Sequence, residues 1–242
     1  MRKRLSPLTS TMSSRSLLLV EAVVIIVSIL LSLYLQGLYD KSRMTERKED
    51  LLQSLATVIE QDMAQIEYFS QIQNRSYRSA ELLLGSDLDI TLDSLYWHLS
   101  SVGMGLRSFF PQRSPFEEII DAQVTRHIRS VELRADLFKL FSEDLERHEV
   151  HTKEYDQLFL TFNRYLSETY LLVDWWREGL GTLPEIDITS FDGSMHPQND
   201  RKLRGMLIEA LFATSSYASE LAYLRAKYSE LQNHIVMELK QN

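Results

Sequence analysis

The stretch that decides the fold is LLLVEAVVIIVSILLSLYL, residues 17–35. This run is apolar except for one Glu and two Ser. At about 1.5 Å of rise per residue, a helix of this length matches the ~30 Å hydrocarbon core of a bilayer. The sequence therefore predicts a transmembrane helix over residues 16–38, with a short basic tail over residues 1–15 before it.

A cleavable signal peptide is the alternative interpretation of this stretch, because Arg2, Lys3 and Arg4 precede it. The run is longer than the apolar part of a usual signal peptide, which spans about 7–15 residues. Residues 34–40, which follow the run, contain no small-x-small cleavage site. We therefore expect an uncleaved anchor.

The orientation of this anchor is not decided by counting positive charges, because the two flanks are equal. The flanking Lys and Arg residues are Arg2, Lys3, Arg4 and Arg15 on one side, and Lys41, Arg43, Arg47 and Lys48 on the other. Large domains cross membranes largely regardless of their charge, so the short tail is the better guide. We expect residues 1–15 in the cytoplasm and residues 39–242 outside it. The absence of Cys agrees with an oxidising compartment.

The composition of the chain favours an all-α domain beyond the anchor. Residues 39–242 are numerous enough for one domain with its own core. Only eight Gly and five Pro occur in the 242 residues, so long helices with short breaks are expected. The net charge of −8 argues against nucleic acid as a partner, because phosphate binding requires a basic face.

Apolar residues at intervals of three and four predict an antiparallel helical bundle, into which the transmembrane helix continues. We expect residues 182–200 to form a loop. The segments expected to be helical are residues 52–84, 88–110, 116–122, 131–148, 155–176 and 203–235.

The transmembrane helix has a polar face that is a candidate contact site. At 100° per residue, Glu21, Ser28, Ser32 and Gln36 fall within a sector of about 80°. Ionisable groups in a bilayer normally face another helix or water, and small Ser residues let a neighbouring helix approach closely. In the alternative interpretation, Glu21 reaches the headgroups while the two hydroxyls bond their own backbone carbonyls. The sequence leaves both interpretations open.

Two segments outside the anchor resemble metal sites only loosely. His148, His151 and Glu154 are spaced by three, but the sequence has neither an HExxH motif nor a Glu-x-x-His pair of the di-iron kind. We expect a solvated polar turn there. Residues 191–194, FDGS, lack the alternating ligands of a calcium-binding loop, so an ordinary turn is expected. We predict no metal and no other cofactor.

Catalytic signatures are missing from the sequence as well. Neither a Gly-x-Ser-x-Gly elbow nor a phosphate-binding loop of the Gly-x-x-x-x-Gly-Lys type occurs. The pair Gly103 and Gly105 lacks a third glycine and a preceding strand. Trp175 and Trp176 suggest either a ligand-stacking wall or a membrane contact, but we expect them to cap the core of the bundle. The sequence gives no catalytic residue.

Three segments of the chain share a pattern with known proteins: residues 21–33 with the charged residues 40–50, FEEII at 116–120, and IRSVELR at 128–134. They resemble a family of uncharacterised bacterial single-pass membrane proteins, in which a Glu-led transmembrane helix precedes a helical domain. The C-terminal amphipathic helix is similar too. The chain departs from the family's pattern at Leu38, where Trp is frequent, and at residues 121–123, where the family has Ser-Ser-Gly. The resemblance implies a helical protein anchored in a bacterial cytoplasmic (inner) membrane. The family has no established activity that could be carried over to this chain.

These observations lead to an expected function based on protein contacts and not on catalysis. The protein would be a scaffold or a subunit of a membrane assembly, bound to the lipid bilayer and to a protein partner or a second copy through its transmembrane helix. The alternative is a single-pass sensor whose helical domain binds a ligand. Because the tail of residues 1–15 is too short for an output domain, such a sensor would signal to a separate membrane partner.

Overall fold

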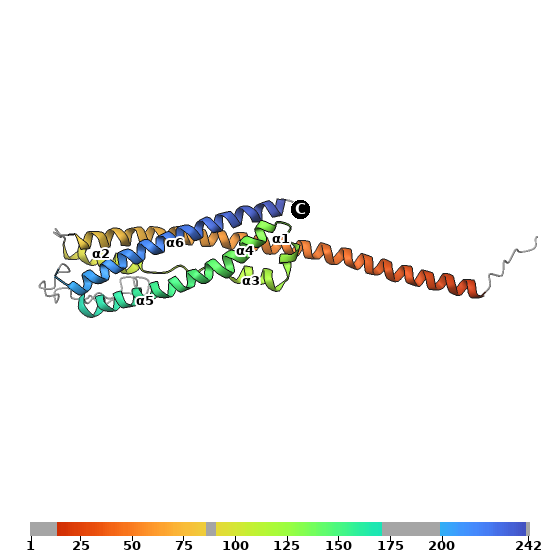
Figure 1. The fold of residues 1–242 in the computed structure, drawn as a ribbon, viewed down its shortest axis with the longest axis horizontal. Helices are drawn as coiled ribbons and strands as arrows, with labels where there is room; N and C mark the ends of the chain where they lie inside the picture. The colour runs from red at the N-terminus through yellow and green to blue at the C-terminus, as the bar shows by residue number, and fades with distance from the viewer. Residues whose placement is uncertain (1–13, 86–90, 171–198, 241–242) are drawn as a thin grey trace, which may run out of the picture. The chain divides into compact units, whose positions relative to one another are not determined.

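The computed structural model describes residues 14–85, 91–170 and 199–240, and most of these residues lie in helices (Figure 1). No strand occurs within these ranges. The chain divides into two compact units, residues 1–49 and residues 50–242. The first helix, α1 (Ser14–Leu84), has residues in both units. The predicted all-α class is confirmed.

The first unit is the apolar N-terminal part of α1. Its large apolar side chains are exposed, from Val23 at 57% to Leu35 at 55%. This helix is long and apolar enough to cross a membrane. An unbroken helix is expected here, because residues 17–36 contain neither Gly nor Pro.

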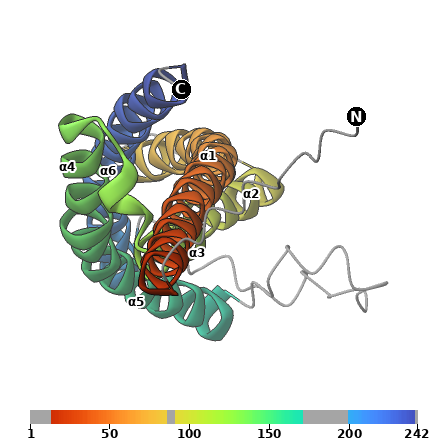
Figure 2. The ribbon, with the colours of Figure 1, turned by 90° about the vertical axis from the view of Figure 1, so that its right-hand side faces the viewer.

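The second unit is a bundle in which residues 50–84 of α1 pack against the helices that follow. Its other helices are α2 (Leu92–Gly105), α3 (Ser114–Asp121), α4 (Val131–Lys139), α5 (Leu145–Tyr170) and α6 (Arg201–Lys240). Two short elements join them, the 3-10 helix η1 (Val124–His127) and the π-helix η2 (Leu140–Asp144). Figure 2 shows these helices from one end of the bundle.

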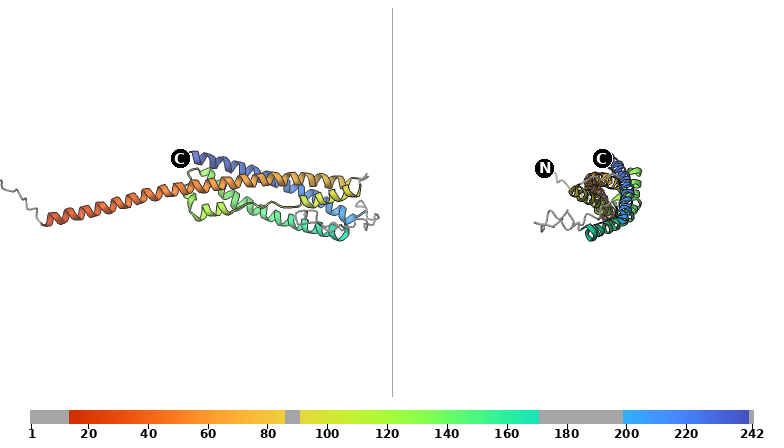
Figure 3. Two further views of the ribbon diagram at one scale, coloured as in Figure 1. Left: turned by 180° about the vertical axis from the view of Figure 1, so that it is seen from behind. Right: turned by 90° about the vertical axis from the view of Figure 1, so that its left-hand side faces the viewer.

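Neighbouring helices of the bundle are antiparallel. Asp62 in α1 contacts Tyr228 in α6, and Glu67, further along α1, contacts Arg225, which comes earlier in α6. The direction of α2 is likewise opposite to that of α1, since Ser76 bonds Val102 while the later Ser79 lies beside His98 (Figure 3). The contacts from α5 to α6 and from α2 to α5 have the same reversed order. The connectivity is therefore that of an up-down-up-down bundle.

We call the four antiparallel segments of the bundle its legs. The second leg, residues 92–113, is only partly helical. The sequence predicted a helix over residues 88–110, but α2 ends at Gly105 and residues 107–113 have no regular secondary structure. At Gly105, a Cβ atom would lie only 1.9 Å from the Cβ of Ser76, so α2 and α1 approach too closely for a side chain where α2 ends. Only glycine permits this approach.

The third leg is longer than predicted. We expected a helix to end near His148, but α4, η2 and α5 follow one another without a break from Val131 to Tyr170. No Gly or Pro interrupts these residues. The π-helix shifts the buried stripe, and His148 and Thr152 occupy buried positions that apolar residues would normally take. Because polar residues occupy core positions here, the apolar pattern is interrupted and predicts a helix end where the helix continues.

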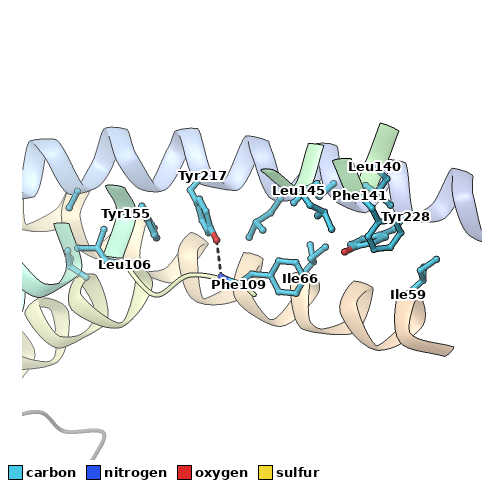
Figure 4. Packing of buried hydrophobic residues seen from close by; sticks show 14 of the residues in the cluster. Ile59, Ile66, Leu106, Phe109, Leu140, Phe141, Leu145, Tyr155, Tyr217 and Tyr228 are labelled. Atoms are coloured by element: carbon cyan, nitrogen blue, oxygen red, sulfur yellow. Dashed lines mark hydrogen bonds between the residues drawn. The ribbon is translucent and has the colours of Figure 1, made fainter. Parts of the chain in front are cut away.

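The remaining helices agree with the sequence prediction. The helix α6 buries Leu203, Leu207, Leu221 and Ile235 at the predicted spacing. The short α3 has Pro at one of its first two positions and covers the helix predicted over residues 116–122 except for Ala122, which caps it. The core is one continuous apolar cluster contributed by all legs (Figure 4). Burial of this cluster is the main source of stability for the bundle.

Candidate functional site

The predicted polar face of the transmembrane helix is exposed in the single chain. The side chains of Glu21, Ser28, Ser32 and Gln36 all lie at the surface of α1. The Ser28 hydroxyl donates to the Val24 carbonyl (2.8 Å), and the Ser32 hydroxyl donates to the Ser28 carbonyl (2.8 Å). Because both hydroxyls are satisfied within their own helix, they need no partner for hydrogen bonding. Any attraction on this face must come from Glu21, Gln36 and close packing.

The core of the bundle contains a buried polar cluster around Phe109. The Phe109 N–H donates to the Tyr217 hydroxyl at 2.8 Å (Figure 4). The Phe109 carbonyl lies 3.1 Å from Nε2 of His148. All three residues are buried. Residues 107–113 lack helical partners for their backbone groups, so side chains must supply them. The cluster is therefore explained by the structure of this segment.

Asp62 bonds to the same segment nearer to its end, and Tyr228 in turn bonds to Asp62. One carboxylate oxygen of Asp62 accepts from the Gln112 N–H (3.2 Å) and from the Tyr228 hydroxyl (3.0 Å). Burial raises the pKa of Asp62, and these two hydrogen bonds partly oppose the rise. The other carboxylate oxygen is buried and has no partner among the described residues. A buried carboxylate oxygen without a hydrogen-bond partner lowers the stability of the fold. The hydrogen bond that Asp62 makes to Gln112 explains why this residue is present in the core.

Tyr155 completes this set of hydrogen bonds at the start of the segment. Its hydroxyl donates to the Gly105 carbonyl at 2.7 Å, which is one of the unpaired carbonyls at the end of α2. Its ring stacks on Tyr217 with a centroid distance of 4.3 Å. Burial raises the pKa of Tyr155 well above its usual range, so the hydroxyl stays protonated as a donor.

The predicted polar turn at His148, His151 and Glu154 is wrong. These residues lie in the helix α5, and His148 is only 1% exposed. Glu220 lies between the two histidines, 3.3 Å from Nδ1 of His148 and 3.6 Å from Nε2 of His151. Within the described part of the chain, no three His, Asp or Glu side chains are grouped so that they could hold a metal ion.

A hollow of about 230 Å³ lies beside this histidine pair, between α5 and α6. Its charged lining is mainly acidic, with Glu154, Glu209 and Glu220 around His151. The hollow therefore does not suit an anion. The acidic groups alone do not define a ligand.

A larger groove of about 490 Å³ lies between α1 and α2. The residues of α1 that line it are Gln71, Asn74, Arg75, Arg78, Ser79 and Leu82, and α2 contributes Trp97 and His98. This volume is within the range of about 300–1,000 Å³ that is typical of small-molecule sites. It is the candidate binding site of the bundle, and we call it the α1–α2 groove.

The α1–α2 groove contains a hydrogen-bonded pair, Ser79 and His98, together with exposed side chains. The buried Ser79 hydroxyl lies 3.1 Å from Nδ1 of His98. The ring of His98 contacts the Trp97 ring edge-to-face at 4.8 Å, and Trp97 is 54% exposed. Burial lowers the pKa of His98, which favours the neutral form of its ring. The positive charge of the groove comes from Arg75 and Arg78.

Sequence reasoning missed the α1–α2 groove. Arg75 and Arg78 are one turn apart on a helix, which is a common surface pattern, and only the fold brings Trp97 to them. The pair Gly103 and Gly105 has a packing role at the end of α2. The candidates Trp175, Trp176 and residues 191–194 lie outside the described residues.

Comparison of the chain with protein-family models, curated proteins and solved structures found no match. The resemblance to a bacterial membrane-protein family therefore stays an expectation.

Proposed function

We propose that this protein is a membrane-anchored helical bundle that works through protein–protein contacts, as a scaffold or as a subunit of a membrane assembly, without catalysis. The observation that carries the proposal is the exposure of the apolar part of α1 together with its polar face. Apolar surface of this extent needs a lipid or protein environment. Lipid suits the apolar side chains, but it does not suit Glu21 and Gln36.

A charged side chain near the bilayer centre costs about 2.5–3.5 kcal/mol on insertion scales, and the cost is smaller for Glu21, which lies in the first third of residues 16–38. A partner helix, or a second copy of the same helix, offsets this cost by offering hydrogen-bonding groups. Ser28 and Ser32 assist because their small side chains, already bonded to their own helix, let a neighbour approach closely. The polar face is therefore the proposed contact surface.

The proposed location is the cytoplasmic (inner) membrane of a bacterium, with residues 1–15 in the cytoplasm and the bundle outside it. The basic tail supports this orientation. A tag at the C-terminus would then be digested by protease added to spheroplasts, while a tag at the N-terminus would be protected. The reverse pattern would contradict the orientation.

The test of the contact surface uses Glu21→Leu and Ser28→Leu in the full chain. Both changes make the helix more apolar, so insertion is retained while the polar face is lost. The matched control is Val27→Leu, because Val27 lies about 140° from the centre of that face. Crosslinked complexes in native membranes should fall about threefold or more for the two variants, as expected for one interhelical contact. Complexes at the wild-type level in both variants would refute the proposal.

A single-pass sensor is the second candidate function. It is favoured by the α1–α2 groove, which has the volume and the mixed polar and aromatic lining of a small-molecule site. In this case a ligand would act on α1, the helix that contributes residues to both units.

A further inference from the structure

We propose that the α1–α2 groove binds a small molecule that carries a phosphate group and a flat ring. The phosphate would lie between Arg75 and Arg78, and the ring would pack on Trp97. This inference goes beyond the proposed contact function and does not depend on the transmembrane face.

The phosphate end of the site rests on two guanidinium groups. Arg75 and Arg78 line the groove from adjacent turns of α1, and both side chains are exposed. Neither forms an ion pair with a carboxylate of the described residues, whereas Arg113 and Arg225 elsewhere in the bundle do. Guanidinium groups bind phosphate oxygens through paired, charge-assisted hydrogen bonds. In a chain with a net charge of −8, this unpaired positive pair favours an anion as the ligand.

The amides of Gln71 and Asn74 extend the polar side of the groove along the same face of α1. Each amide offers both donors and an acceptor. They can therefore bond to a phosphate oxygen or to the polar edge of a heterocyclic ring. This lining fits a ligand with more than one polar group.

The ring end of the site rests on Trp97. Its indole is exposed although it is the largest side chain of the groove, and the edge-to-face contact with His98 supports one side of it. His98 is in turn held by the buried Ser79. A supported aromatic surface loses little conformational entropy when a flat ring stacks on it. Leu82 adds apolar lining to the same groove.

The experiment uses the full chain in detergent micelles, with ¹⁵N-labelled Trp, and follows the indole signals by NMR. The chain has three Trp residues, and the variant Trp97→Phe assigns the signal of interest. The probes are AMP, which has a phosphate and a ring, adenosine, which has the ring without the phosphate, and inorganic phosphate. We expect AMP to shift the Trp97 signal with a Kd below about 1 mM. Adenosine and phosphate should each bind about tenfold more weakly, or worse.

The charge contribution is tested with Arg78→Gln and Arg75→Gln. Each should weaken AMP binding about tenfold, the effect of losing one charge-assisted contact. The control is Arg164→Gln, which changes the same charge at an exposed position of α5 outside the groove, and it should change the Kd less than about twofold. Because these arginines are exposed, the circular dichroism spectrum of each variant should match that of the wild type.

Three results would overturn the proposal. The first is a Trp97 signal that does not move with AMP up to about 10 mM, ten times the expected upper limit of Kd. Inorganic phosphate binding as tightly as AMP would show that the ring takes no part. Equal effects of Arg164→Gln and Arg78→Gln would show that AMP responds only to the overall charge of the protein. None of these outcomes bears on the transmembrane contact, so the two proposals fail separately.

Discussion

The substitution Tyr217→Phe tests whether the buried polar cluster holds the segment of residues 107–113 in place. It removes one oxygen atom and keeps the ring that stacks on Tyr155. The lost hydroxyl accepts the hydrogen bond of the Phe109 N–H at 2.8 Å. Phe109 is fully buried, so water cannot replace the missing acceptor without opening the core. The change therefore leaves a buried backbone donor without a partner.

The expected cost follows from this geometry. Leaving a buried donor unsatisfied costs about 1–3 kcal/mol, more than the ~1 kcal/mol net value of an average hydrogen bond. The Tyr217 hydroxyl also lies 3.5 Å from Nε2 of His148, but that distance is too long for a strong contribution. We expect the free energy of unfolding to fall by about 2 kcal/mol, a roughly 30-fold change in the folding equilibrium.

The assay is urea unfolding of the full chain in detergent, followed by circular dichroism. The control is Tyr68→Phe, the same chemical change at a side chain that is 59% exposed, and it should change the free energy of unfolding by less than about 0.5 kcal/mol. Equal stability of Tyr217→Phe and Tyr68→Phe would refute the idea that the segment depends on side-chain partners. A spectrum dominated by strand in the wild type would contradict the fold itself.

Three further predictions concern pH, close packing and backbone strain. Burial raises the pKa of Tyr217 to about 12, from an ordinary value of 10.0. The unfolded chain then loses this proton from pH 10 upward while the folded chain keeps it, so the contribution of Tyr217 to stability should fall between pH 10 and 12 by up to about 1.4 kcal/mol per pH unit, and other buried tyrosines such as Tyr155 add to the slope. Tyr217→Phe should make the total slope shallower by the contribution of one proton, and an unchanged slope would contradict the assignment. Gly105→Ala should lower the free energy of unfolding by about 1–3 kcal/mol because its Cβ would clash with Ser76. Gly205→Ala, which has open space around it, should raise the free energy of unfolding by about 0.5–1 kcal/mol. Equal shifts of the two melting temperatures would be inconsistent with this packing. Gln123→Gly should stabilise the bundle by about 0.5–1 kcal/mol because Gln123 has a φ of 55°, and a lower melting temperature would exclude strain at this position.

The helical legs were predictable because apolar periodicity reports burial directly. The stripe of α6 could be read from the sequence, and the unbroken course of α1 from the scarcity of Gly and Pro. The errors arose where the core is polar. His148 and Thr152 occupy core positions of α5, and a reading based on apolar residues cannot recognise them as buried.

The end of α2 at Gly105 was also not predictable from local sequence. Nothing within residues 88–110 shows that α1 approaches to the distance that excludes a Cβ atom. Once α2 ends, residues 107–113 need hydrogen-bond partners, and these come from positions 62, 148 and 217, which are far apart in the chain. The α1–α2 groove was missed for the same reason, because Trp97 joins the two arginines only through the fold.

The polar residues fall into two groups, those that hold residues 107–113 and those that line the α1–α2 groove. This difference decides how variants at these positions should be interpreted. His148, Asp62 and Tyr217 resemble catalytic residues in chemistry and burial, but each of them makes a hydrogen bond to the backbone of residues 107–113. Loss of function in variants at these positions would therefore report a damaged fold. Arg75 and Arg78 bind no described carboxylate and are exposed, so their replacement leaves the core intact. A functional defect in those variants, with an unchanged melting curve, would locate activity in the α1–α2 groove.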